Sequence, residues 1–151
     1  MSIARTYAEF CADLSYGDLP PAVVDDAKRL VLDTVGIAVG ALPRAESSDA
    51  IVAGARALDG GAEGATVLAT GERMAPQYAA FLNGALAHSL DYDDTHRASS
   101  LHPGAPVIPA ALAAAERAGA SGEELLAGIV AGYEVVTRLG MAVDADRKSV
   151  V

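Results

Sequence analysis

Residues 101–140, LHPGAPVIPAALAAAERAGASGEELLAGIVAGYEVVTRLG, are the part of the chain that decides the fold. The stretch is rich in alanine, the strongest helix former. Pro103, Pro106 and Pro109 recur every third residue, and each lacks an amide hydrogen and disfavours helix in the residue before it. We therefore predict a helix that begins between Pro106 and Pro109 and ends at Gly119.

A second helix is expected immediately after this one, over residues 122–140. Ser121 and Glu124 have the spacing of a capping box, in which each side chain accepts a hydrogen bond from the other's backbone amide. Gly128 and Gly132 lie one turn apart on the same face. This spacing predicts that a neighbouring helix backbone approaches closely at both glycines.

The rest of the chain continues the helical pattern. Apolar residues at helical spacing, together with proline and glycine breaks, predict helices over 3–14, 21–40, 46–58 and 76–90. Residues 65–70, ATVLAT, form a brief extended segment that we expect to be too isolated for a sheet. The fold class predicted is all-α, a bundle-like arrangement of helices.

Composition supports this class and excludes several functions. The 151 residues are 52% hydrophobic but only 5% aromatic, with no Trp, which predicts one domain whose helices pack closely through alanine. The net charge of −9 argues against nucleic acid as a partner. Cys11 is the single cysteine, so the chain has no internal disulfide. We find no signal peptide and no continuous apolar span, and expect a cytoplasmic protein without a membrane anchor.

The groups able to move protons are concentrated in residues 83–106, NGALAHSLDYDDTHRASSLHPGAP. Imidazole titrates nearest neutrality, and carboxylates are its usual partners in proton transfer. The stretch contains every histidine of the chain and three carboxylates within four positions: His88, His96, His102, Asp91, Asp93 and Asp94. We expect the active site within residues 83–104 of this stretch.

Among these side chains, His102 is the strongest candidate for a proton donor or acceptor. It precedes Pro103, which stiffens its backbone, and Gly104, which leaves room for a ligand. For His96, a solvent-exposed loop position is the stronger interpretation. The aspartates are compatible with capping of nearby backbone amides.

Two chemistries compete for the cluster. One is proton abstraction beside a carboxylate or carbonyl, with His as the base. The other is a Zn, Mn or Fe site, for which imidazole and carboxylate are suitable ligands. The candidate ligands would be His88, Asp91, Asp94, His96 and His102. Their spacing matches no tight metal signature and HExxH is absent, so we predict no metal.

A family resemblance favours the first chemistry. Residues 81–96, FLNGALAHSLDYDDTH, and residues 101–140 resemble the N-terminal half of the MmgE/PrpD family. The combination is specific: NG-x3-H-x2-D-x-DD-x-H, then HPG, then a helix containing GYE. A weaker match extends back through residues 30–41, LVLDTVGIAVGA.

The resemblance implies a large helical domain, a smaller α+β domain, homodimers, and cofactor-free chemistry on small polycarboxylates. The family includes 2-methylcitrate dehydratase, cis-aconitate decarboxylase and iminodisuccinate epimerase, which share proton transfer at a carbon next to a carboxylate. By the same resemblance, Asp91, Thr95 and His102 line the active site as catalytic residues. Further substrate contacts are expected from His88, Asp94, His96 and Arg97.

We therefore expect a lyase, most simply a 2-methylcitrate-type dehydratase of propionate catabolism. His102 would be the acid or base, Asp91 would orient it or balance its charge, and Thr95 would bind a substrate carboxylate. Epimerisation or decarboxylation would use the same residues. Outside the family, the alternatives are a metal-dependent hydrolase and a non-catalytic helical dimerisation module.

The end of the chain suggests that the natural protein is longer. We expect residues 1–145 to be part of the family's helical domain, and residues 146–151, DRKSVV, to be a non-native tail. The family's other histidine and lysines would then follow Ala145. Within the His/Asp stretch, Arg97 is the one permanent cation, so a fragment of this length should bind a polyanion weakly and be inactive.

Overall fold

The computed structural model describes residues 2–61 and 64–143, and within them the fold is all-α, as predicted. The proposed non-native tail lies outside the described residues. The helices and strands in chain order are α1 (Ile3–Asp13), the 3-10 turn η1 (Tyr16–Asp18), α2 (Pro21–Ala41), α3 (Ser48–Asp59), β1 (Ala65–Thr66), β2 (Arg73–Met74), α4 (Pro76–His88), α5 (Gly104–Ala118) and α6 (Gly122–Ala142).

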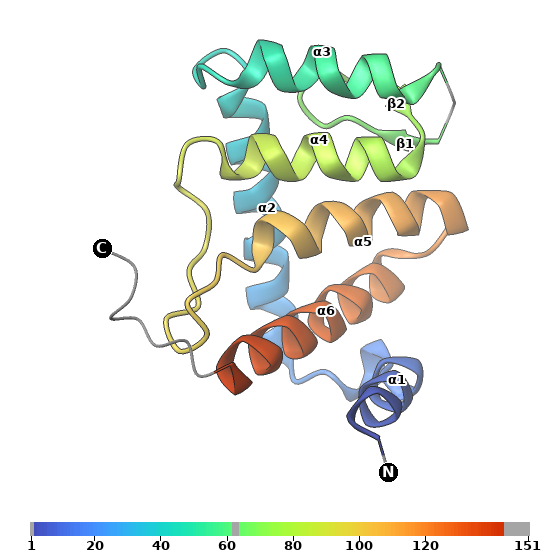
Figure 1. Cartoon of the computed structure of the whole chain (residues 1–151). Coiled ribbons are helices and arrows are strands. Elements are labelled where there is room, and N and C mark those ends of the chain that lie inside the picture. Colours follow the sequence, from blue (N-terminus) through green and yellow to red (C-terminus); the bar gives the residue numbers. More distant parts are fainter. Residues whose placement is uncertain (1, 62–63, 144–151) are drawn as a thin grey trace.

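Four helices form a stack, in which α3, α4, α5 and α6 follow one another while α2 crosses them (Figure 1). The helix α1 packs beside α6 at one end. Small side chains dominate the core, and the largest fully buried side chains include Leu82, Leu86, Ile108 and Ile129. By length and composition alone, α6 is apolar enough to cross a membrane, and in this fold it packs against α5.

The extended segment is not isolated, which corrects the sequence prediction. β1 pairs antiparallel with β2, so that Ala65 lies opposite Met74. The buried side chain of Asn83 secures this hairpin, accepting from the Leu68 amide at 2.8 Å and donating to the Thr66 carbonyl at 2.9 Å. The side-chain amide of Asn83 on α4 therefore supplies hydrogen bonds that neighbouring strands would supply in a larger sheet.

The helix α5 begins at Gly104, earlier than the prolines predict. The first four amides of a helix have no acceptor within it, so Pro106 loses nothing in the first turn. Pro109 lies inside the helix, where it cannot donate to the carbonyl of Ala105. That carbonyl faces Gly84 on α4, where an added Cβ would lie 2.7 Å from its oxygen.

The last helix matches its prediction except at the two glycines. The capping box is present, with the Glu124 amide 3.2 Å from Ser121 Oγ and the Ser121 amide 2.7 Å from Glu124 Oε2. At Gly132 the neighbouring helix α5 is close, but a side chain rather than the backbone occupies the space: a Cβ would lie 2.6 Å from Val107 Cγ1. The predicted close approach is wrong at Gly128, which has no atom within 4 Å of a Cβ position.

The segment between α4 and α5 runs down one side of the stack to the C-terminal end of α6 (Figure 1). Its far point is held there because Gly140 leaves space for Ser99, whose Cβ would be 2.7 Å from an added Cβ. A short bridge between His96 and Leu101 closes the loop on itself. The chain then returns to the stack with His102 immediately before α5.

Candidate active site

The two histidines that flank this loop meet at one end of the helix stack. His88 is the last residue of α4, and His102 lies two residues before α5. The close contact of Gly84 with Ala105 brings these helix ends together. The imidazole rings are 5.0 Å apart between centroids, edge to face.

Asp93 lies beside both rings, near the Nδ1 atom of each. Both of its carboxylate oxygens are 3.0 Å from His88 Nδ1, and Oδ1 is 3.4 Å from His102 Nδ1. Its side chain is only 1% exposed, which is unusual for a carboxylate and requires compensating partners. Asp93 is not among the predicted site residues. Three aspartates within four positions gave no signal of which one points inward.

The path of the loop after α4 decides which of the aspartates is buried and which is exposed. Asp91 has a φ of 54°, in the left-handed region that aspartate tolerates better than most residues. Its side chain is 82% exposed, with Oδ1 3.9 Å from His102 Nε2. The structure therefore places the predicted catalytic pair Asp91 and His102 next to each other, but with Asp91 on the solvent side.

Asp94 is engaged in the fold rather than directed at the cluster. Its Oδ1 accepts from the Gly104 amide at 2.8 Å, and its Oδ2 accepts from the Tyr133 hydroxyl at 3.0 Å. It thus joins the loop to the first turn of α5 and to the middle of α6. Its role in substrate binding stays a prediction, and both oxygens already have partners.

Tyr133 is, after Asp93, the second residue near the site that was not predicted, although it belongs to the GYE sequence of the family resemblance. Burial, followed by the neighbouring Asp94 carboxylate, raises the pKa of Tyr133 well above its ordinary value. The hydroxyl therefore remains a donor across the physiological range. It acts as a fixed support for the loop.

We expect Tyr133→Phe to lower the free energy of unfolding by about 1 kcal/mol, because Asp94 loses a donor. The difference should shrink as the pH rises above about 10, the ordinary tyrosine value. There the unfolded wild-type chain releases a phenol proton that the folded chain retains, so wild-type stability falls. Urea unfolding of both proteins from pH 7 to 11 measures this, and a constant difference would contradict the assignment.

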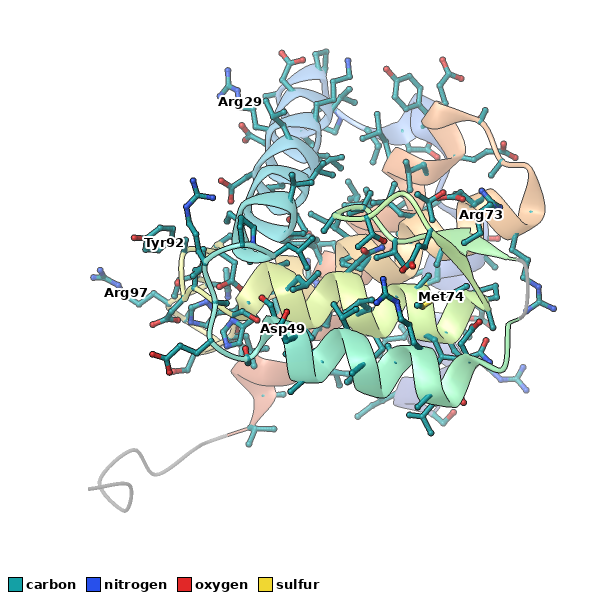
Figure 2. All side chains as sticks on the ribbon, turned by 90° about the horizontal axis from the view of Figure 1, so that it is seen from above. Arg29, Asp49, Arg73, Met74, Tyr92 and Arg97 are labelled. Atoms are coloured by element: carbon teal, nitrogen blue, oxygen red, sulfur yellow. The ribbon has the colours of Figure 1, made fainter. Side chains whose placement is uncertain are left out.

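The other predicted site residues lie farther along the loop. His96 is bound to Ser99, with Nδ1 2.7 Å from the Ser99 hydroxyl and 3.3 Å from its amide. Thr95 and Arg97 are exposed. Figure 2 shows Arg97 and Tyr92 pointing outward from this part of the molecule. Their roles toward a substrate stay predictions.

A cavity of about 730 Å³ opens beside the histidine pair, which is large enough for a small organic acid. α4 forms one wall, and the start of α5 with the end of the loop forms the other. The lining is largely apolar, with both imidazoles among its few polar groups. It includes Phe81, Gly84, His88, Leu101, His102 and Ala105.

The same cluster has the composition of a metal site. One ligand atom from each of His88, Asp91, Asp93 and His102 can be chosen so that all lie within 4.8 Å of one another. Asp94 and His96, which the sequence analysis included among candidate ligands, do not belong to this group. The arrangement can therefore transfer protons, and its donor set also suits a divalent cation.

The chain belongs to the MmgE/PrpD family: residues 5–150 match the MmgE/PrpD N-terminal domain. It is 34% identical to a cis-aconitate decarboxylase-like protein of Aspergillus oryzae over 149 residues, 89% of this chain and 30% of the relative. It is also 34% identical to the human cis-aconitate decarboxylase over 143 residues, 91% of this chain and 29% of the relative.

A cis-aconitate decarboxylase of Aspergillus terreus is 31% identical over 146 residues, 90% of this chain and 29% of the relative. The chain therefore spans less than a third of the length of these curated relatives. Family membership is shown for nearly the whole chain. The activity that a protein as long as these relatives would have is proposed below.

Proposed function

We propose that this chain provides the proton-transfer part of a lyase that acts on a small polycarboxylate, with decarboxylation of a cis-aconitate-type substrate as the preferred reaction. The observation that carries the proposal is the pair His88 and His102, which share one buried carboxylate beside an open cavity. The names of the relatives support decarboxylation over the dehydration that we first expected.

The chemistry of decarboxylation matches a histidine acid. Breaking the bond to one carboxylate releases CO2 and leaves an electron pair on carbon, which the adjacent double bond and another carboxylate delocalise. A positioned acid then returns one proton to carbon. His102 lies at the cavity and, as an imidazolium, would donate that proton.

The local charge is unfavourable for a tricarboxylate unless cations are added. Two aspartates, Asp91 and Asp93, lie beside the histidines, and Arg97 is the permanent cation of the loop. A protonated imidazole offsets part of this negative charge. We propose that residues outside this chain supply the remaining cations, so the protein of the relatives' length is the form to assay.

Product analysis of that longer protein tests the proposal. We expect it to release CO2 from cis-aconitate and to form an unsaturated dicarboxylate, in which a proton has replaced the lost carboxylate on carbon. We expect turnover of 2-methylcitrate and iminodisuccinate to be at least ~10²-fold slower. Water loss from 2-methylcitrate as the fastest reaction would favour a dehydratase, and no turnover of any of the three would refute the polycarboxylate assignment.

The same assay distinguishes the proton-transfer proposal from the alternative, in which the cluster binds the metal of a metal-dependent hydrolase. The proton-transfer proposal expects turnover to survive dialysis against a chelator. Stoichiometric Zn, Mn or Fe in the purified protein, lost together with activity in His88→Ala, would favour the hydrolase instead.

A further inference from the structure

We propose that Asp93 is the positioning residue of this site: it holds His88 and His102 with their Nδ1 atoms protonated, so that each imidazole keeps a bare Nε2. The inference concerns the state of the two rings in the folded chain. Only its consequence for turnover rests on the proposed function. The family motif contains Asp93, but the resemblance gives it no role, and the distances to the two imidazoles single it out.

Both rings approach Asp93 through the same atom. His88 Nδ1 is 3.0 Å from each carboxylate oxygen, and His102 Nδ1 is 3.4 Å from Oδ1. An ionised carboxylate can only accept hydrogen bonds, so the nitrogen facing it must carry the proton. A neutral imidazole has one such proton, which leaves Nε2 as an unprotonated base.

Burial makes the opposite tautomer costly. Asp93 is 1% exposed at its side chain, and His102 Nδ1 is itself buried. Within the described residues, this nitrogen is the one buried side-chain polar atom that lacks a well-aligned hydrogen bond. The carboxylate oxygen Oδ1 of Asp93 is an acceptor 3.4 Å from this nitrogen, within hydrogen-bond distance. A bare Nδ1 would instead place a lone pair against a carboxylate out of water.

The third histidine provides an internal contrast. His96 Nδ1 lies 3.3 Å from the backbone amide of Ser99, which can only donate. That nitrogen must therefore be an acceptor, and the neutral ring carries its proton on Nε2. The structure thus assigns one tautomer to His88 and His102 and the other to His96.

Nitrogen-15 NMR of this 151-residue chain tests the assignment directly, because it contains only three histidines. Protonated and bare ring nitrogens resonate far apart. Spectra would be recorded at about pH 8.5, well above the pKa of about 6.5 that an ordinary imidazole has. We expect a protonated Nδ1 for His88 and His102 and a protonated Nε2 for His96. A protonated Nε2 on His102 in the wild-type chain would overturn the proposal without any variant.

Two matched substitutions locate the cause. In Asp93→Asn, the amide can donate toward an Nδ1, and we expect the Nδ1-protonated fraction of His102 to fall by more than half. In Asp91→Asn, which alters the exposed carboxylate near Nε2, we expect no change in this fraction. Retention of the His96 signals shows that the loop is still folded. An unchanged His102 tautomer in a folded Asp93→Asn chain would refute the role of Asp93.

In the longer enzyme, Asp93→Asn should lower kcat by about 10²-fold while KM changes less than about threefold. A role confined to folding would instead lower the active fraction and leave the tautomer of the folded molecules unchanged. If no polycarboxylate is turned over while the tautomers are as assigned, the proposed function fails and the role of Asp93 stands.

Discussion

Replacing His102 by glutamine is expected to lower turnover of the longer enzyme by at least ~10²-fold, with either cis-aconitate or 2-methylcitrate as substrate. The imidazole lies at the cavity, half-buried, with Asp93 behind it and Asp91 beside Nε2. Glutamine preserves a polar side chain of similar length but can neither accept nor release a proton near neutrality. Initial rates with saturating substrate measure the effect.

The unfolding midpoint of His102→Gln is the control. We expect a change of no more than about 1 kcal/mol in the free energy of unfolding, because the side chain is partly exposed and its Nδ1 makes no well-aligned hydrogen bond. Wild-type turnover in a folded His102→Gln enzyme would remove the acid–base role. It would leave the non-catalytic dimerisation module as the better interpretation of the cluster.

The second large effect is structural: Gly84→Ala is expected to lower the free energy of unfolding by about 2–3 kcal/mol. The new Cβ would lie 2.7 Å from the backbone oxygen of Ala105, and no rotamer change can relieve a clash with backbone. The helices α4 and α5 would have to move apart. Because His88 is one turn beyond Gly84, its ring would move away from His102 and turnover would also fall.

Gly128→Ala is the matched control for this substitution. Gly128 is also a helix glycine, but no atom lies within 4 Å of its Cβ position. We expect this variant to gain about 0.5–1 kcal/mol, as alanine does over glycine in open helix. Urea unfolding of both variants measures the difference, and equal effects at the two positions would contradict the close crossing of α4 and α5.

Much of the fold could be predicted from local signals. Helical periodicity, the capping box at Ser121 and the stop at Gly119 each act within a few residues, and all three are present in the structure. The errors occur where distant segments meet. The pairing of β1 depends on Asn83 of α4, and the early start of α5 depends on Asp94, which accepts from the Gly104 amide.

By itself the sequence determined the helical class, the family resemblance and the stretch in which the proton-transferring groups lie, because these follow from composition and short-range spacing. Only the tertiary structure decided which aspartate serves the histidines. Asp91 and Asp93 are chemically identical and two residues apart, and a left-handed turn at Asp91 leaves one exposed and the other buried. The Asp93 carboxylate is buried beside two imidazole rings that the crossing of α4 and α5 brings together. This burial depends on segments far apart in the sequence, so no local pattern encodes it.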